Sequence, residues 1–588
     1  EMEGVLIRKM RIFSTLFISL LFCLPGCLSI SPDENSSVIE NEDQPIEIEE
    51  PLMQFNPITN DIILGNESLK ILDHKKIEFF TNLVQQNHDN MVLNLTIPKF
   101  GGNWSHYFVC SDGTPIEYTS QKTESFYCPN TSEVLSGEQY NSSWRTLRHR
   151  EIIRDIGLTS SLAYASTGIP SEASLAKNIL IEYSMLYPEL IISDKLNRTI
   201  EIGGKLTSQS LDEAVFLIDL AWMYHLVNPI LNTSEKASIE ENLLMDAVGV
   251  LRTEGNQNRG NLSNWFTYHN AAIGMVAAAT GNQSLMNESL YSGNGLIKQI
   301  KGGFDSDGFW HEGSIAYHNY TLTAMALHLE AAEHMGVDLF DFNWTNSDGN
   351  LMHIKDPFVA HLKLIRPDMT FPRLNDAIDV MTLIDVIDLL EYTNFHWDDS
   401  LVDSLLAHIR PEIQIQTYRA ILWTSQIQSK SVQLSSVDFS NFGISVVRMN
   451  GHYVLMDYGP HGGWHGHKDK LNLEVSNQFG AVFEDPGTVR YSLPASEDWY
   501  RSSFAHTTIS FDDEEQPKMT GYLVGTNHTV DGSVVVAGFN DTENGLSVER
   551  ALVVLPIDNG IVIFDLFRVN LENNVNISRT YHYRNAPN

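Results

Sequence analysis

The hydrophobic and polar positions of the chain follow a helical period through its long central part. In residues 211–231 (LDEAVFLIDLAWMYHLVNPIL), apolar side chains recur at the spacing of one helix face, and Pro229 and Asn232 mark the end of the helix. Further segments of this kind, each ending near Gly, Asn or Pro, are 238–254, 268–282, 321–336 and 381–394. Repeated helix–loop–helix units of this length predict a helical domain over residues 145–432, in an array that suits closure into an (α/α) toroid. No strict sequence period specifies that closure.

The pattern changes after about residue 435. Apolar and polar residues then alternate, β-branched residues are enriched, and turn residues separate the segments, as in 442–459, 532–539, 548–556 and 559–569. The sequences MNGH and IDNG are typical of hairpin turns. Residues 433–588 are therefore predicted to form an antiparallel β-sandwich, in an α+β multidomain chain. The chain stops at YHYRNAPN soon after a strand-like segment, which suggests a fragment boundary.

The N-terminal part resembles an export signal. Residues 1–27 contain a basic stretch, a short apolar core and Leu24-Pro25-Gly26-Cys27, which is similar to a lipoprotein cleavage box with Cys27 as the lipidated residue. The apolar run is too short to favour a membrane-spanning helix. Residues 28–58 are acidic and contain Pro, Ser and Asn, as expected of a disordered tether. Residues 59–144 have a mixed pattern that assigns no fold. We expect an exported protein whose only membrane contact is its lipid anchor.

Cysteine usage agrees with export. Of the four cysteines, Cys23 lies in the signal and Cys27 is the lipidation site, so Cys110 and Cys128 remain as a disulfide in an oxidising compartment. Glycosylation sequons are abundant, at Asn66, Asn94, Asn103, Asn130, Asn197, Asn282, Asn343 and elsewhere. The net charge of −36 over 588 residues argues against a nucleic-acid partner, because phosphate binding requires a basic face.

Histidines are concentrated in the segment GPHGGWHGHKDKLNLEV (459–475). On an extended backbone, His465 and His467 would project from one face. Asp485 follows in EDPGT, and His506 follows in SSFAHTTIS. Two imidazoles and a carboxylate suit a divalent metal, with zinc as the default and a fourth position open to water. The alternative is a polar loop of surface histidines.

Two helical-domain segments also carry candidate chemistry. NWFTYHNAAIG contains Asn264, Trp265, His269 and Asn270, although a capping Asn on a packed amphipathic helix explains the same pattern. In DGFWHEGSIAYHNY, the crowded residues are Trp310, His311, Glu312, Tyr317, His318 and Tyr320. Aromatic rings beside histidine and carboxylate suit a carbohydrate cleft, and a tyrosine in such a cleft can serve as a general acid or base. The alternative is an aromatic helix start packed into a core.

Together these segments resemble the heparinase II/III-like polysaccharide lyases, a group that includes exo-acting alginate lyases. The matching motifs are NWFTYHNAAIG, DGFWHEGSIAYHNY, FPRLNDA (371–377), HGGWHGHKDKLNLEV, EDPGT and YRSSFAHTTIS, in the family's order over about residues 260–512. The resemblance implies an (α/α) toroid and a β-sandwich with the active site between them. It also implies a structural Zn²⁺ in the β-sandwich domain, held by His467, Asp485 and His506.

The resemblance further implies catalytic roles. Tyr317 would be the acid/base, His465 the catalytic histidine of the β-domain, and His269 the histidine near the substrate carboxylate, with Asn264 or Asn270 as its amide companion. Where some alginate lyases of this group have Arg and heparinase-like members have Glu, this chain has Ala272. Arg501, Arg490 or the cluster Arg145, Arg148 and Arg150 would then have to supply the missing positive charge. Trp265, Trp310 and Glu312 are further candidates for substrate contact.

The expected reaction is β-elimination on an acidic, uronic-acid-containing polysaccharide or oligosaccharide. It removes the C5 proton, stabilises the carboxylate and protonates the leaving O4. A glycoside hydrolase is a rival, with Glu312 and either Asp307 or Asp376 as its carboxylate pair. A uronate epimerase would share the first half of the chemistry, and a non-catalytic glycan-binding lipoprotein would explain the aromatic residues and the anchor. The polymer, the choice of base and the oligomeric state remain open at this level.

Overall fold

The structure is a computed structural model that describes residues 78–82, 95–121, 123–199, 202–257, 262–411, 417–428, 431–542, 545–571 and 575–583. The predicted signal peptide, its Cys27 and the acidic tether lie outside these residues. Among the described residues, no helix is both long enough and apolar enough to cross a membrane.

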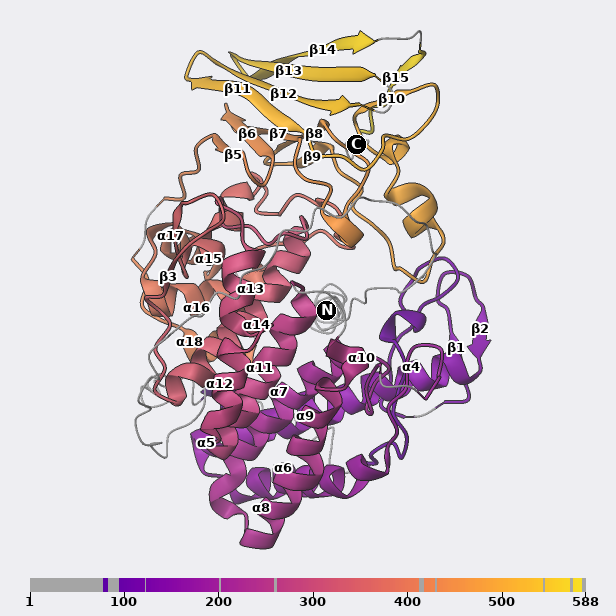
Figure 1. Cartoon of the computed structure of the whole chain (residues 1–588), viewed down its shortest axis with the longest axis vertical. Coiled ribbons are helices and arrows are strands. Elements are labelled where there is room, and N and C mark those ends of the chain that lie inside the picture. The colour runs from indigo at the N-terminus through magenta and orange to yellow at the C-terminus, as the bar shows by residue number, and fades with distance from the viewer. Residues whose placement is uncertain are drawn as a thin grey trace, which may run out of the picture.

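A large helical domain occupies the lower part of the molecule (Figure 1). Its helices are α4 (Glu138–Arg150), α5 (Thr159–Thr167), α6 (Pro170–Leu186), α7 (Ser210–Val227), α8 (Thr233–Ile239), α9 (Asp246–Leu251), α10 (Glu254–Gln257), α11 (Asn264–Thr280), α12 (Gln283–Tyr291), α13 (Leu296–Gly303), α14 (Ile315–His334), α15 (Asp356–Ala360), α16 (Ile387–Trp397), α17 (Ser400–Ile409) and α18 (Tyr418–Trp423). The helical prediction for this part of the chain is confirmed, although some boundaries differ. The segment expected to be helical from residue 381 starts its helix only at Ile387, because Asp385 accepts hydrogen bonds from the Thr382 N–H and hydroxyl and forms a turn there.

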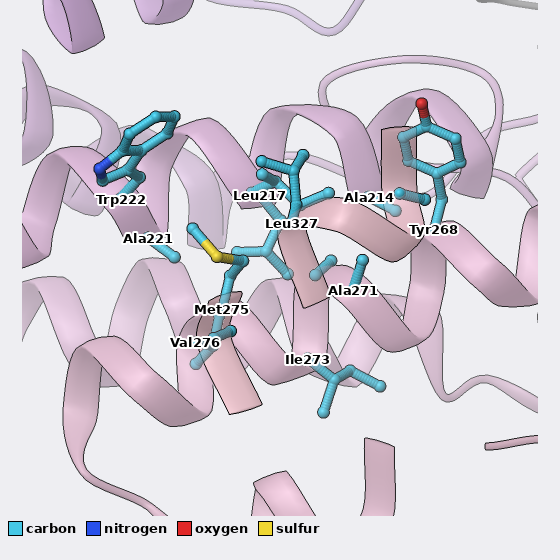
Figure 2. Close-up of a cluster of buried hydrophobic side chains, with 14 of the residues drawn as sticks. Ala214, Leu217, Ala221, Trp222, Tyr268, Ala271, Ile273, Met275, Val276 and Leu327 are labelled. Atoms are coloured by element: carbon cyan, nitrogen blue, oxygen red, sulfur yellow. The ribbon is translucent and has the colours of Figure 1, made fainter. Parts of the chain in front are cut away.

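Helices α7, α11 and α14 form the centre of this domain. All residues of α11 from Asn264 to Ala279 are buried, as expected for a helix surrounded by others. The rings of Tyr268 and Tyr320 lie 4.2 Å apart, and a Cβ at Gly274 would lie 2.5 Å from the His328 ring, so α11 and α14 run in the same direction. In Figure 2, α7 also runs parallel to α11, since Ala214 lies near Tyr268 and Trp222 lies towards Met275. The three helices therefore begin at one end of the domain.

A β-sandwich lies above the helices (Figure 1). One antiparallel sheet consists of β5 (Val437–Phe439), β6 (Ile444–Met449), β7 (His452–Asp457), β8 (Asn472–Asn477) and β9 (Gly480–Phe483), in that order. The second consists of β11 (Tyr522–Thr529), β12 (Gly532–Asp541), β13 (Leu546–Ile557) and β14 (Gly560–Leu571). Short strand pairs are β1 (Ser125–Tyr127) with β2 (Val134–Ser136), β3 (Asn343–Thr345) with β4 (Leu351–His353), and β10 (Ile509–Phe511) with β15 (Ile577–Arg579). The predicted fold class, a helical toroid followed by an antiparallel β-sandwich, is confirmed.

The first sheet is buried on both faces. Val454 and Met456 face the second sheet and pack in one core with Val548. Tyr453 and Leu455 face the other way and pack with helical-domain residues in a second core. A strand between two apolar layers need not alternate apolar and polar residues, and β7 (HYVLMD) has four consecutive apolar residues. In β8 (NLEVSN) the polar residues Asn472 and Glu474 are also buried, where they bond Asp485 and Arg366. The helical domain and the sandwich therefore share a hydrophobic interface.

The N-terminal region, which the sequence left unassigned, contacts both domains. The structure joins Cys110 and Cys128 in a disulfide within a small buried cluster. Asn103 donates from its amide to the Lys195 carbonyl of the helical domain (3.1 Å), and Ser492 of the β-domain donates to the His106 carbonyl (3.0 Å). Asn103 is only 3% exposed, so this predicted sequon has no room for a glycan in the folded protein.

Replacing both cysteines (Cys110→Ala with Cys128→Ala) should destabilise this region by about 3 kcal/mol, because the cross-link closes a loop with a sequence separation of 18. Hydrogen exchange of the amides between residues 104 and 136 measures the effect. Reducing the wild-type protein should reproduce it, and reducing the double variant should add nothing. Equal protection in the variant and the oxidised wild type would contradict the prediction.

Candidate active site

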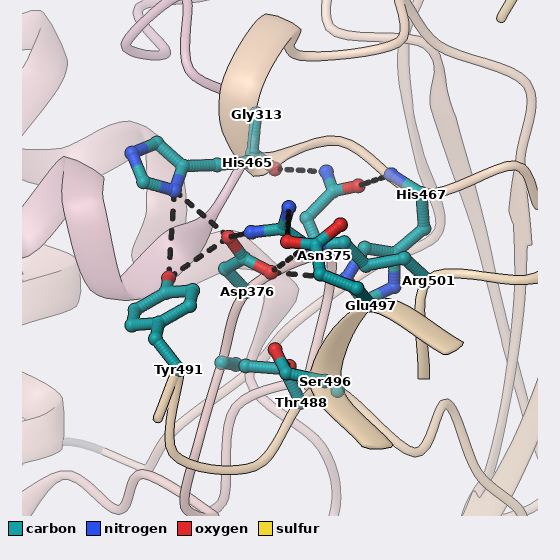
Figure 3. A network of polar contacts seen from close by, with 12 residues as sticks. Gly313, Asn375, Asp376, His465, His467, Thr488, Tyr491, Ser496, Glu497 and Arg501 are labelled. Carbon is teal, nitrogen blue, oxygen red and sulfur yellow. Dashed lines mark hydrogen bonds and ion pairs between the residues drawn. The ribbon is translucent and has the colours of Figure 1, made fainter. Parts of the chain in front are cut away.

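The buried carboxylate of Asp376 is the centre of a polar network between the two domains (Figure 3). Its Oδ2 accepts from His465 Nδ1 (2.8 Å), Tyr491 OH (2.8 Å) and Arg501 Nη2 (2.6 Å). Its Oδ1 lies 3.2 Å from His467 Nε2 and 3.1 Å from Arg501 Nε. Burial favours the protonated acid, but the hydrogen bonds from His465 and His467 outweigh it and hold the pKa of Asp376 well below its usual range. The group is a permanent anion that orients four side chains of the β-domain.

Asn375 brings the neighbouring segments together. Its backbone is left-handed (φ 54°), which Asn tolerates better than most residues. Its amide donates to the Gly313 carbonyl (2.9 Å), just before α14, and its Oδ1 accepts from the His467 N–H (3.0 Å). On the opposite side, a Cβ at Gly462 would lie 2.9 Å from the Glu312 carbonyl. Asn375 and Gly462 thus permit the close approach of the histidine-rich loop to the start of α14.

Tyr317 lies against His465. It is buried in the first turn of α14, and the two rings stack with centroids 3.7 Å apart. The Tyr317 and Tyr491 hydroxyls are 3.0 Å apart. Because Tyr491 donates its own proton to Asp376, Tyr317 is the donor in this pair. Burial, followed by the charges of Tyr491 and Asp376, raises the pKa of Tyr317 well above its usual value, so its phenol is protonated at rest.

His467, Asp485 and His506 come together as a buried cluster. Their ligand atoms all lie within 4.8 Å of one another, a spacing that fits one metal ion. His506 Nδ1 donates to the Ser502 carbonyl (2.8 Å), and His467 Nε2 donates to Asp376, so each histidine has its lone pair on the other nitrogen. These two nitrogens, His467 Nδ1 and His506 Nε2, are 3.2 Å apart. Two facing lone pairs repel each other unless a cation lies between them.

Acidic groups surround this cluster. Asp485 Oδ1 lies 3.5 Å from His506 Nε2, and Asp469 Oδ2 lies 3.7 Å from the same nitrogen. Burial opposes protonation of His506, but these two carboxylates outweigh it and raise the pKa of His506 to about 9. Asn472 donates to Asp485 Oδ2 (2.9 Å) and holds that carboxylate in place. The cluster attracts positive charge, whether a metal ion or a proton.

The helical-domain candidates gather at the start of α11. Asn264 donates from its amide to Glu312 Oε2 (3.0 Å), and Trp310 Nε1 donates to the same oxygen (2.8 Å). His269 follows one turn later and is 1% exposed. Asn270 donates to the Asn294 carbonyl (2.7 Å), so Asn264 and Asn270 each have one amide hydrogen bond within the protein.

The two candidate tryptophans are both buried. Trp265, next to Asn264, is 6% exposed, and Trp310 is 1% exposed. The Trp310 ring packs edge-on against Phe304 at 5.2 Å, and a Cβ at Gly303 would lie 2.1 Å from it. No ring face of Trp310 is open to a sugar. Trp310 is therefore a core residue, and its indole N–H holds the Glu312 carboxylate in place.

The cations expected to replace the charge missing at Ala272 already have partners. Arg501 binds Asp376 and Glu497. Arg145 binds Glu138, and Arg148 binds Glu151. Ala272 itself is fully buried in the core of the helical domain, where a charged side chain has no room. The neutral groups Asn264 and His269, at the amino end of α11, are candidates for contact with a substrate carboxylate.

Sequence reasoning missed two members of this network. The sequence suggests Asp376 only as a hydrolase carboxylate, although FPRLNDA is among the matching motifs. Tyr491, six residues after Asp485, has no recognisable signal, since a lone tyrosine in a loop is common.

Two family models match the chain. Residues 193–357 match the model described as alginate lyase, and residues 432–586 match the model described as heparinase II/III-like, C-terminal. The chain therefore matches an alginate lyase model in its helical part and a heparinase II/III-like model in its β-domain, which confirms the resemblance drawn from its motifs.

Among individual proteins, an exo-oligoalginate lyase of Saccharophagus degradans is 23% identical over 459 residues, which cover 72% of this chain and 60% of the relative. An alginate lyase of Stenotrophomonas maltophilia is 24% identical over 453 residues, covering 70% and 59%. The chain thus spans less than two thirds of the length of these relatives. The solved structure of a heparinase III (BT4657 gene product) is similar with a TM-score of 0.51 at 16% identity, covering 89% of this chain and 80% of that chain, which supports the fold.

Asp376→Asn should lower the free energy of unfolding by about 3 kcal/mol, because it removes the buried one of the two carboxylates that bind the largely buried Arg501 guanidinium. Glu497→Gln is the matched control, since Glu497 binds the same Arg501 but is 66% exposed, and exposed pairs contribute about 0–1 kcal/mol. Denaturant unfolding of both variants makes the comparison. Equal effects of the two substitutions would contradict the central place of Asp376.

Proposed function

We propose that the protein is a lyase that cleaves a uronic-acid polysaccharide by β-elimination. The observation that carries this proposal is the pairing of a protonated Tyr317 with His465, which Asp376 holds in a defined tautomer. Acid and base chemistry at one position is what elimination requires, and the two domain matches point to the same class of reaction.

The assigned roles follow from the hydrogen bonds. Because the Asp376 carboxylate can only accept, His465 Nδ1 carries the proton and Nε2 has a free lone pair. We assign His465 Nε2 as the base that removes the C5 proton and Tyr317 as the acid that protonates O4. The C–H electron pair forms the C4–C5 double bond as the C4–O4 bond breaks. Asn264 and His269 would stabilise the charge that builds on the C5 carboxylate.

Alginate is the polymer that we favour. Both curated relatives are named as enzymes that act on alginate or its oligomers, and neither of the two groups assigned to the carboxylate, Asn264 and His269, is a permanent cation suited to sulfate. The acidic net charge of −36 also disfavours a more highly charged polymer.

A glycoside hydrolase fits the site less well. Its two carboxylates would have to be free to reach the bond, but Asp376 holds four side chains, and Glu312 accepts from Asn264 and Trp310. Asp307 accepts from the Asn441 and Phe442 backbone N–H groups. An epimerase would also remove the proton at C5. Its product keeps the glycosidic bond, and this distinguishes an epimerase from a lyase.

We also propose that His467, Asp485 and His506 hold a zinc ion. The two facing lone pairs and the neighbouring carboxylate form a donor set that suits zinc, and the remaining imidazole nitrogens have the hydrogen-bond partners typical of zinc-binding histidines. Bound there, the ion would supply a positive charge that three β-domain segments coordinate, and it would hold those segments together. Asp376, which contacts both His467 and His465, would link this cluster to the reacting residues.

Export as a lipoprotein is a further part of the proposal. It rests on the cleavage-box sequence that ends at Cys27 and on the Cys110–Cys128 disulfide, which suits an oxidising compartment.

Mixing the protein with uronic-acid polymers should produce the ultraviolet absorbance of an unsaturated uronate, strongest with alginate. Tyr317→Phe should lower kcat about 1,000-fold, because general acid catalysis contributes about 10²–10⁴-fold. Tyr392→Phe, which removes a buried hydroxyl in the helical domain, is the control and should keep its activity. Reducing ends formed without this absorbance would contradict the lyase proposal and favour a hydrolase.

Elemental analysis should find one zinc per chain, and none in His506→Ala. Removing zinc from the wild type with a chelator should lower the midpoint of thermal unfolding, since a ligand at 1,000 times its Kd stabilises by about 4 kcal/mol. Returning zinc should restore the midpoint. If the wild type contains no metal and the chelator does not change its midpoint of thermal unfolding, a proton and not a metal lies between the two histidines.

A further inference from the structure

Tyr491 belongs to a loop, residues 484–494, that contains no helix or strand. Its hydroxyl accepts a hydrogen bond from Tyr317 of the helical domain (3.0 Å) and donates one to Asp376 (2.8 Å; Figure 3). In the proposed reaction Tyr317 gives its proton to O4 and becomes a phenolate, to which the Tyr491 hydroxyl can then donate instead of to Asp376. The position of this loop therefore affects how easily Tyr317 releases its proton.

The N-terminal lobe, residues 95–121 and 123–136, contacts this loop at three successive residues. The rings of His106 and Tyr491 lie 5.8 Å apart between their centroids. Ser492 donates from its hydroxyl to the His106 carbonyl (3.0 Å). A Cβ at Gly113 would lie 2.9 Å from Leu493 Cδ1, so the backbone of the lobe approaches the loop closely. The lobe therefore supports the loop on both sides of Ser492.

The helical domain in turn holds His106. This residue is 1% exposed and lies in a short helical turn, Ser105–Tyr107. Just before the turn, the Trp104 carbonyl accepts from the Ser143 hydroxyl of α4 (2.8 Å), and Lys195 Nζ lies 3.9 Å from the centre of the Trp104 ring. The Trp104 and His106 rings are 4.8 Å apart between their centroids. A continuous series of contacts thus runs from the helical domain, which carries Tyr317, through the lobe to the loop of the β-domain.

We propose that His106 is a positioning residue for Tyr491, so that the N-terminal lobe is a third part of the active site. By packing against the ring of Tyr491, His106 keeps the Tyr491 hydroxyl within hydrogen-bond distance of Tyr317. Because His106 is almost fully buried, it acts through Tyr491 and not on the substrate. This inference rests on the proposed lyase function and adds to it a part of the chain that neither family model covers.

The rate of unsaturated-uronate formation from an alginate tetrasaccharide tests the proposal. His106→Ala should lower kcat about tenfold, since a misplacement of about 1 Å in an active site can cost about 100-fold. It should leave KM unchanged, because no substrate contact is lost. Ser492→Ala, which removes the hydrogen bond between loop and lobe, should lower kcat in the same direction by a smaller factor, and it carries the test if His106→Ala does not fold.

Both effects should disappear when Tyr491→Phe is added, because this protein has no hydroxyl at position 491 to place. Two substitutions that act through one contact are not additive, so the comparison of single and double variants isolates the path through Tyr491. Tyr118→Phe is the matched control. It removes a hydrogen bond between the same lobe and Glu151 of the helical domain, so it should lower the melting temperature and leave kcat unchanged.

An unchanged kcat in both His106→Ala and Ser492→Ala would overturn the inference. A loss of kcat that persists in the Tyr491→Phe background, or an equal loss in Tyr118→Phe, would also overturn it, because the lobe would then contribute stability alone. A higher KM with full kcat would assign His106 to substrate binding instead. If the wild type forms no unsaturated uronate from any uronic-acid polymer, the proposed function itself fails, and the inference fails with it.

Discussion

The buried carboxylate of Asp376 holds together the parts of this molecule that matter for its chemistry. It comes from the loop before α16, whereas His465, His467, Tyr491 and Arg501 all come from the β-domain. An anion without solvent is stable only while its donors remain in place. The arrangement of the two domains and the tautomer of His465 therefore depend on the same carboxylate. The same contacts that join the domains also place His465 against Tyr317.

The protein is acidic and its proposed substrate is acidic too, so their mutual repulsion has to be overcome. The well-buried cations near the domain interface are neutralised within the protein: Arg366 binds Glu474 and Glu484, and Lys470 lies 3.0 Å from Asp469. In the proposed function, amides and imidazoles at a helix amino end contact the substrate and stabilise charge locally without a net cation. Long-range repulsion at a net charge of −36 is weakened by salt, whose screening length is about 8 Å at physiological ionic strength.

Much of the architecture could be predicted from the sequence, because helical and alternating periods reflect local burial. The hairpin at Asn450 and Gly451, both with positive φ, matches its MNGH signal. The cluster of His467, Asp485 and His506 was also predictable, since the residue types suit one metal and short hairpins bring them together. The Asp376 network was not, because its members come from two domains and no spacing encodes their meeting. At Trp310 the sequence predicted a function that the structure does not support. An aromatic residue beside polar ones suggested a sugar contact, but tertiary packing buries this ring.

Running the reaction in water enriched in oxygen-18 tests the central claim most directly. Elimination breaks the C4–O4 bond without adding water, so the products should contain no heavy oxygen from the cleavage step and their masses should sum to that of the substrate. Mass spectrometry of the products of an alginate oligosaccharide reports both quantities. Products heavier than the substrate by one labelled water would show hydrolysis and contradict the assignment of Tyr317 and His465 as an acid and base for elimination.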